Sequence, residues 1–147
     1  MKKERHAIIS ASYLILVKDD KVLLLRRYNT GYEDGNYSLI AGHVDKDESV
    51  LECAMREAKE EANIDINKED LEVVHVMHRK ATENNDERMD FFIRCSKWAG
   101  ELKNMEPNKC DDLRWFLSDD LPENTLGYVK HALERERAGD FYSELGW

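Results

Sequence analysis

The stretch from Gly42 to Ile64 constrains the fold more than any other part of the chain, because it has the pattern of a loop followed by an amphipathic helix. Ser49 and Glu52 have the spacing of a capping box, which predicts that the helix begins here. With about 100° between successive residues, one narrow stripe of this helix is apolar. We expect that stripe to be the buried face; it consists of Leu51, Ala54, Met55, Ala58 and Ala62.

Three glutamates lie beside the apolar stripe, and their arrangement should destabilise the helix. Glu57, Glu60 and Glu61 are three and four residues apart, so their like charges repel each other. The last two also lie near the negative end of the helix dipole, which costs roughly a few tenths of a kcal/mol each. Arg56 offsets part of this repulsion. Local conflict of this kind is typical of functional sites, and clustered carboxylates suit a hard divalent cation such as Mg²⁺.

A solvated acidic helix face is the alternative interpretation, but the order of the residues argues against it. Gly42, Glu48, the run Arg56-Glu57-Ala58-Lys59-Glu60-Glu61 and Asn63-Ile64 closely resemble the Nudix box, the 23-residue signature of the Nudix hydrolases, which include the MutT-like nucleotide pyrophosphohydrolases. One position departs from the signature, because Asn63 replaces the usual glycine. Asn is the commonest substitute for Gly in the left-handed conformation that ends a helix, so we expect the turn to survive.

The resemblance implies a fold for the whole chain. It is an α/β fold of the Nudix type, an α/β/α sandwich with a mixed β-sheet between helices, and we expect residues 1–147 to form one such domain with the box at 42–64. The residues agree, since strand patterns alternate with two helical patterns.

The resemblance also implies roles for the residues of the box. Glu57, Glu60, Glu61 and the Gly42 carbonyl would hold one or more Mg²⁺ ions, with Mn²⁺ as a substitute. Arg56 would orient the cluster through Glu48 and Glu60 and would not touch the substrate.

Three further site residues are expected outside the box. Arg27 ends a predicted strand, where Nudix enzymes often carry an arginine that contacts phosphate. Glu106 lies in a long loop from which many Nudix enzymes direct a carboxylate at the box helix, where it binds metal or takes the proton of the attacking water. Either Glu106 or a box glutamate would accept that proton. Glu106 is favoured over Glu87 and Glu83. In nucleotide-cleaving Nudix enzymes the residues that enter the last helix can read the base edge, so the resemblance makes Asn124, whose amide has both a donor and an acceptor, our candidate for that role.

The rest of the chain shows a regular succession of elements. Ala7–Val17 and Val22–Leu25 should pair as a hairpin, and Leu71–Lys80 alternates so that Leu71, Val73, His75 and Met77 would share one face. Further strands are expected at 89–96 and 113–117, the second after a loop over 98–112. A final helix is expected at about 126–138, and the aromatic tail 141–147 should dock on the body or on a partner.

Composition excludes several classes of function. The net charge is −9 and 36% of the residues are charged, which argues against binding of a nucleic acid polymer along its phosphate backbone. No apolar run is long enough to cross a membrane, and the three cysteines have no metal-site spacing. We therefore expect a cytoplasmic protein whose partner is a small nucleotide; its oligomeric state stays open.

The expected function is that of a metal-dependent hydrolase that cleaves the diphosphate linkage of a nucleoside diphosphate derivative. A nucleoside triphosphate, converted to monophosphate and pyrophosphate, is the favoured substrate. Two alternatives stay open: a Nudix-fold module that binds or senses a nucleotide without cleaving it, and a structural domain with an acidic helix.

Overall fold

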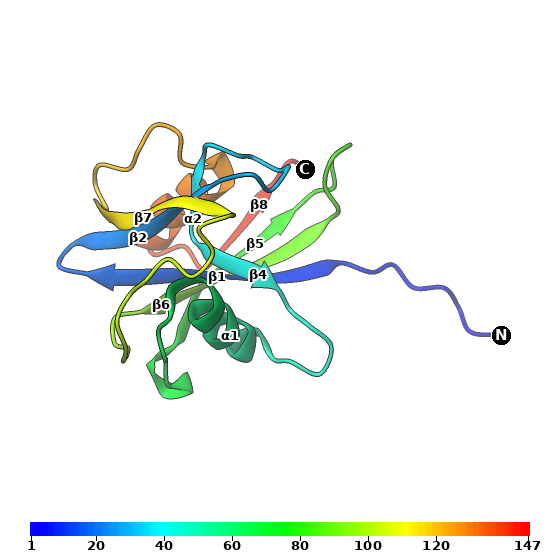
Figure 1. The fold of residues 1–147 in the computed structure, drawn as a ribbon. Helices are drawn as coiled ribbons and strands as arrows, with labels where there is room; N and C mark the ends of the chain where they lie inside the picture. Colours follow the sequence, from blue (N-terminus) through cyan, green and yellow to red (C-terminus); the bar gives the residue numbers. More distant parts are fainter.

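The computed structural model describes residues 1–147 and contains eight strands, two α-helices and one short 3-10 helix (Figure 1). In chain order they are β1 Ile9–Lys18, β2 Lys21–Arg27, β3 Tyr37–Ser38, β4 Ile40–His43, α1 Val50–Ala62, η1 Lys68–Asp70, β5 Glu72–Arg79, β6 Arg88–Cys95, β7 Cys110–Leu117, α2 Gly127–Arg137 and β8 Tyr142–Leu145.

The strands form one mixed sheet. Its hydrogen-bonded order is β3-β2-β1-β6-β5-β8, with β4 added to β1 and β7 added to β2. The pairs β1–β6 and β5–β8 are parallel and the others are antiparallel. The predicted hairpin is confirmed as β1 and β2, which turn at Asp19 and Asp20, both with positive φ.

Helices cover both faces of this sheet, so the predicted sandwich is confirmed. Leu14 and Leu16 of β1 point to one side, where they share a core with Ala54 and Ala58 of α1. The alternate residues of β1, such as Ile15, point to the other side and pack in the core that contains Val129 and Leu133 of α2. Figure 1 shows α1 and α2 on the two sides of β1 accordingly.

Helix α1 begins and ends as predicted. The Ser49 hydroxyl accepts from the Glu52 amide at 3.1 Å, and the Glu52 carboxylate accepts from the Ser49 amide at 3.2 Å, which completes the capping box. Asn63 adopts the left-handed conformation, with φ 63° and ψ 25°. The buried face also includes Cys53, which the predicted stripe omitted.

The prediction that Leu71, Val73, His75 and Met77 share one face is wrong. The pairing of β5 with β6 shifts register between Val73 and His75, which inserts an extra residue and reverses the alternation. Leu71 and Val73 therefore lie in the core on the α1 side, whereas Met77 lies in the core on the α2 side. Alternation alone does not reveal such a bulge.

The C-terminal third agrees with the prediction except at one boundary. Strand β7 begins at Cys110 instead of 113, because its pairing with β2 continues to Arg27 past an irregularity at Arg26. Helix α2 lies within the predicted limits. The aromatic tail docks on the body as β8, parallel to β5, and the Trp147 indole donates to the His78 carbonyl at 3.1 Å.

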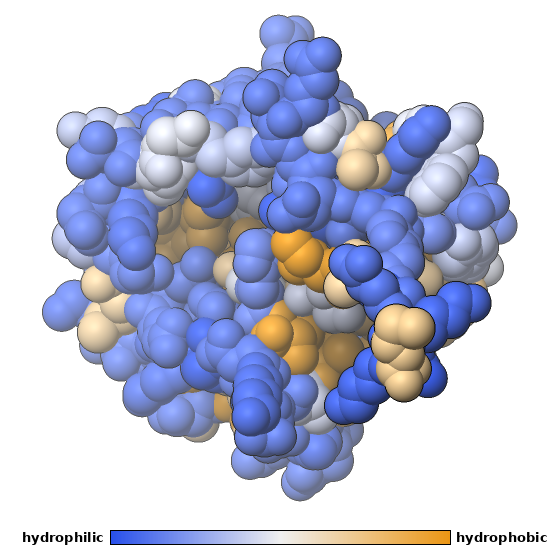
Figure 2. All heavy atoms as spheres, turned by 90° about the vertical axis from the view of Figure 1, so that its right-hand side faces the viewer, coloured by the Kyte–Doolittle hydropathy of each residue, from blue (hydrophilic) through white to orange (hydrophobic).

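The face of the molecule drawn in Figure 2 is predominantly hydrophilic. Figure 2 shows one face, on which hydrophobic atoms are visible mainly in recesses between hydrophilic side chains. Neither helix combines the length and the apolar character needed to cross a bilayer.

Candidate functional site

The three box glutamates predicted to hold the cation line one cavity of about 480 Å³, which we call the carboxylate cavity; Glu48 does not line it. It lies between the C-terminal half of α1, the end of β2 and the loop that precedes β7. Its lining residues are Leu25, Arg27, Asn29, Thr30, Glu57, Glu60, Glu61, Glu106, Lys109 and Cys110. Four carboxylates thus face a space that contains only two cationic side chains.

Arg56 organises the acidic residues around α1. Its Nε and Nη2 donate to the two oxygens of Glu48 at 2.6 and 3.0 Å, and its Nη1 donates to Glu57 at 2.7 Å and to Glu60 at 3.4 Å. The guanidinium also reaches the His43 carbonyl at 3.2 Å. Arg56 itself does not line the cavity. The predicted contacts with Glu48 and Glu60 are therefore present, with Glu57 as an additional partner, and the positioning role of Arg56 stays a prediction.

The pKa of Glu48 is shifted in the opposite direction to those of Glu57 and Glu61. The bidentate bond from Arg56 lowers the pKa of Glu48 to about 2. Burial raises the pKa of Glu57 despite its bond to Arg56, and burial beside Glu57 and Glu106 raises the pKa of Glu61 well above its ordinary value. The cavity therefore holds carboxylates whose negative charge is poorly compensated by the protein.

Strand β4 closes one side of this cluster. The Ala41 amide donates to Glu61 at 3.2 Å. A β-carbon at Gly42 would overlap the Glu57 carboxylate, so a side chain at this position would displace Glu57 from its present place. Gly42 thus allows Glu57 to approach the backbone of β4.

Glu106 reaches the cavity because its loop is tied to the end of α1. The last carbonyls of the helix lack partners within it, and two of them accept from loop amides: Lys103 donates to Ala62 at 3.0 Å and Met105 donates to Glu61 at 3.2 Å. The Asn63 side chain adds a bond to the Glu101 carbonyl at 3.1 Å. The asparagine that replaces the usual glycine therefore also fastens this loop.

The other candidates for the proton acceptor lie elsewhere. Glu87 is bonded to His78 at 2.7 Å and to His6 at 2.9 Å, and neither Glu87 nor Glu83 lines the carboxylate cavity. The structure thus brings only Glu106 of the three to the box glutamates.

Arg27 and Asn124 differ in their placement. Arg27 lines the carboxylate cavity and is held by the Tyr32 carbonyl at 2.7 Å and the Thr30 hydroxyl at 3.0 Å. The Asn124 amide donates to the Gly35 carbonyl at 2.8 Å and does not line that cavity. One of its donors is therefore used to hold the loop before β3, and its role at a base edge stays a prediction.

Sequence reasoning missed Lys109. Its ammonium lies 3.7 Å from the Glu106 carboxylate, so the cavity contains a second cation opposite the box helix. The three-residue spacing between Glu106 and Lys109 could have indicated the pair, since residues so spaced in a turn are neighbours.

The chemistry of the lining fits a divalent cation. Carboxylate oxygens are the ligands that Mg²⁺ and Mn²⁺ prefer, and a cation would stabilise the charged form of Glu61, whose pKa is raised by burial and by the nearby charges of Glu57 and Glu106. In the present side-chain arrangement no three His, Cys, Asp or Glu side chains are grouped closely enough to hold an ion. Coordination of one ion by three of these glutamates therefore requires their side chains to turn, and Arg56 already donates to one oxygen of Glu57.

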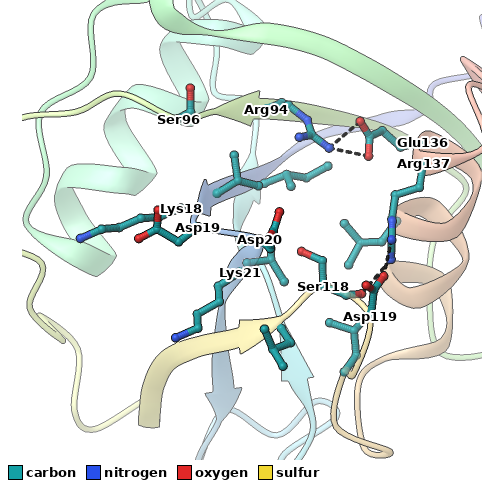
Figure 3. Close-up of a pocket in the computed structure, with 16 residues that line it drawn as sticks. Lys18, Asp19, Asp20, Lys21, Arg94, Ser96, Ser118, Asp119, Glu136 and Arg137 are labelled. Carbon is teal, nitrogen blue, oxygen red and sulfur yellow. Dashed lines mark hydrogen bonds and ion pairs between the residues drawn. The ribbon is translucent and has the colours of Figure 1, made fainter.

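A larger cavity, of about 670 Å³, lies at the other end of β2 (Figure 3). We call it the ion-paired cavity. Arg94 donates to both oxygens of Glu136 at 2.7 and 2.8 Å, and Arg137 is paired with Asp119. Its lining contains four basic side chains (Lys18, Lys21, Arg94 and Arg137) and four acidic ones (Asp19, Asp20, Asp119 and Glu136). Its charges are balanced, so it lacks the conflict found at the box.

Fold and site together define an α/β/α sandwich domain with a carboxylate-lined cavity beside its central sheet. The sequence profile of the NUDIX domain matches residues 8–137. The chain belongs to the Nudix family, and the resemblance seen in residues 42–64 is thereby confirmed.

Known proteins similar to this chain agree with that assignment. The NAD-capped RNA hydrolase NudC of Stutzerimonas stutzeri is 31% identical over 114 residues, which cover 78% of this chain and 38% of the relative. The ADP compounds hydrolase NudE of Escherichia coli is 29% identical over 108 residues, 74% of this chain and 56% of the relative. The crystal structure of a MutT NUDIX hydrolase from Burkholderia pseudomallei superposes with a TM-score of 0.80 and 26% identity, over 88% of this chain and 98% of that one.

The match to the first two proteins is partial. The chain spans about two fifths of the NudC relative and just over half of the NudE relative. These similarities show the family and its fold.

Proposed function

We propose that the chain is a divalent-cation-dependent hydrolase that cleaves the diphosphate linkage of a nucleoside diphosphate derivative, with Mg²⁺ as the cation. One observation carries this proposal: Glu57, Glu60, Glu61 and Glu106 line a single cavity together with the cations Arg27 and Lys109. Carboxylates and phosphates are both negatively charged and repel each other. Such a cavity therefore suits a phosphate chain that arrives with a metal ion, to which both groups bind.

The cation would be held by Glu57, Glu60, Glu61 and the Gly42 carbonyl. When bound, it supplies charge neutralisation at phosphate and a water of lowered pKa. Arg56 keeps Glu57 and Glu60 in place from outside the cavity, while Arg27 and Lys109 contact the phosphate oxygens.

The reaction is the addition of water across a P–O–P bridge. Glu106 accepts a proton from the attacking water, whose oxygen bonds to one phosphorus while the bond from that phosphorus to the bridging oxygen breaks. The bridging oxygen leaves with the second phosphate group. Glu106 is the proposed base because its loop is fixed on the end of α1 and places it opposite the box glutamates.

A nucleoside triphosphate that yields monophosphate and pyrophosphate is the first substrate class to test. The similarity to an ADP compounds hydrolase and to NAD-capped RNA hydrolases suggests a second substrate class to test. In that class the diphosphate joins the nucleoside to another nucleoside or to a sugar. A screen that detects products over nucleoside triphosphates, sugar nucleotides, dinucleoside polyphosphates and NAD, each with and without Mg²⁺, tests the proposal. We expect cation-dependent release of a nucleoside monophosphate from at least one class.

A binding module is the second candidate function. The residues argue against it, since every charged position of the box is present. Tight nucleotide binding without product in the same screen would favour the module over the hydrolase.

A further inference from the structure

The loop between β6 and β7, which carries Glu106, runs alongside the end of α1. Residues 99–105 of this loop lie antiparallel to residues 61–65, so that each later loop residue meets an earlier residue of the helix end. Figure 1 shows the loop, in yellow-green, beside the end of α1. We call the contacts between the two segments the loop ladder. Because Glu106 follows directly after this segment, the ladder determines where its side chain begins.

The loop ladder has backbone bonds at both of its ends. At one end, Asp65 and Ala99 exchange two bonds of 2.9 Å each. At the other end lie the two bonds from loop amides to the last carbonyls of α1, the second of which joins Met105 to Glu61. Glu61 is itself a cavity glutamate. The loop is therefore tied to a box residue one position before Glu106.

Asn63 supplies the contact between these two ends. Its backbone amide is not available to the ladder, because the left-handed turn directs it back to the carbonyls of Ala58 and Lys59. The side chain bonds to the loop instead, and its Nδ2 donates to the Glu101 carbonyl at 3.1 Å. A glycine at position 63 would leave the Glu101 carbonyl without this bond.

The ladder acts against electrostatic repulsion. Burial, and then the charges of Glu57 and Glu106, raise the pKa of Glu61, so a charged Glu106 is repelled by the cavity carboxylates when no cation lies between them. Lys109 lies 3.7 Å from Glu106 but its side chain is 61% exposed, so this pair offsets only a small part of the repulsion. The bonds of the ladder therefore help to hold Glu106 near the box glutamates.

The turn that carries Glu106 is also held on the side of β7. The Glu106 carbonyl accepts from the amides of Lys109 and Cys110 at 2.8 and 2.9 Å. The Asn104 side chain spans the turn, since it accepts from the Glu106 amide at 3.1 Å and donates to the Cys110 carbonyl at 2.8 Å. Glu106 thus lies between two attachments, and the loop ladder is the one that fixes its distance from α1.

We propose that Asn63 is a positioning residue for Glu106, and that its side-chain bond to Glu101 sets the distance between Glu106 and the box glutamates. This inference rests on the proposed function, because it assigns the group that keeps the base within reach of the attacking water. A displacement of about 1 Å can cost an enzyme about a hundredfold in rate. The position at which the chain departs from the Nudix signature would then contribute to catalysis in a way that glycine does not.

Asn63→Gly tests the bond, because it removes the side chain and keeps a left-handed turn that glycine adopts readily. We expect kcat to fall about tenfold. The Michaelis constant should change by less than about twofold, since the proposed phosphate contacts Arg27 and Lys109 are held by other bonds, including one of 2.9 Å from the Tyr28 amide to the Lys109 carbonyl. The control is Asp20→Gly, which replaces another left-handed residue, with φ 61°, at the far end of β2 and should keep the wild-type kcat.

A double-mutant cycle tests whether Asn63 acts through Glu106. In the Glu106→Gln background the proposed base is absent, so Asn63→Gly should change kcat by less than about twofold. A loss of about tenfold that persists in this background, or wild-type kcat in Asn63→Gly alone, would overturn the inference. Wild-type kcat in Glu106→Gln alone would overturn the assignment of the base, and with it this role of Asn63.

Hydrogen exchange at single amides tests the bond without any turnover. In Asn63→Gly the amides of Lys103 and Met105 should exchange about fivefold faster than in the wild-type chain, the scale of one lost hydrogen bond, while that of Ala54 within α1 keeps its rate. Unchanged exchange at both loop amides would overturn the inference even if no substrate is found. A failure of the proposed hydrolysis is detected separately, by the substrate screen.

Discussion

The carboxylate cavity and the ion-paired cavity lie at the two ends of β2 and differ in how their charges are compensated. The ion-paired cavity is larger, about 670 against 480 Å³, but its four acidic and four basic side chains are balanced. In the carboxylate cavity four glutamates face Arg27 and Lys109. Uncompensated charge, and not volume, therefore distinguishes the candidate site, because charge conflicts of this kind are typical of functional sites, where a ligand relieves them.

The largest expected effect is on turnover when a box carboxylate loses its charge. Glu57→Gln and Glu61→Gln keep the shape of the side chain but remove a charged ligand, which should lower kcat by about a thousandfold or more, since a bound cation contributes several kcal/mol. Steady-state assays on the substrate found by the screen measure this. The control is Glu136→Gln in the ion-paired cavity, which should retain wild-type kcat. Near-normal turnover in both box variants would contradict the claim that the carboxylate cavity, and not the ion-paired cavity, is the functional site.

The next effect concerns the proton acceptor. Glu106→Gln should lower kcat by about a hundredfold, the usual scale for loss of a general base. Glu101→Gln, an exposed change in the same loop, is the control. If Glu106→Gln keeps the rate of wild type, the base is one of the box glutamates.

A smaller effect is expected at Gly42. In Gly42→Ala the new methyl group would overlap the Glu57 carboxylate and displace it, so kcat should fall about tenfold while the protein stays folded. Gly127→Ala, where the added methyl group meets open space, serves as the control. Equal activities in the two variants would show that the approach of Glu57 to β4 is unimportant.

The smallest effect is on the free energy of unfolding. A Glu→Gln substitution should raise it in the carboxylate cavity and lower it in the ion-paired cavity. The pKa of Glu61 is raised above its ordinary 4.5. Between pH 4.5 and that raised value, the folded protein therefore binds more protons than the unfolded chain. The free energy of unfolding falls as the pH rises through this window. Without metal at pH 7, Glu61→Gln should therefore raise the free energy of unfolding, by about 1 kcal/mol, and the gain should vanish towards pH 4.5. Glu136→Gln should lower it by about as much, through lost bonds to Arg94. Urea unfolding at several pH values measures both; a destabilised Glu61→Gln at pH 7 would contradict the argument.

Local signals made much of the fold predictable. The capping box at Ser49 and Glu52 and the left-handed Asn63 fix the limits of α1 from a few neighbouring residues, and helix α2 follows from its own periodicity. The bulge between Val73 and His75 was not predictable, because it is a property of how β5 pairs with β6. The alternation of apolar residues in the sequence before the bulge does not indicate that the register will shift by one residue.

The candidate site was predictable where its residues share one element. The box glutamates lie on α1, so their common face follows from helical spacing, and Glu106 was suggested only by the resemblance. The bond from Asn63 to Glu101 joins two segments whose contact is set by tertiary packing, and Lys109 reaches the cavity through a loop that is fixed on the end of α1. Specificity depends on such non-local contacts, which is why the sequence left the substrate open.

A crystal structure of the protein soaked with Mn²⁺ and a non-hydrolysable nucleotide analogue would test the central claim most directly, since the anomalous signal locates the ion. The account predicts an anomalous peak in contact with oxygens of Glu57 and Glu61 in the carboxylate cavity, and none in the ion-paired cavity. A nucleotide bound with no ion among those glutamates, or an ion held instead by Asp119 and Glu136, would contradict it.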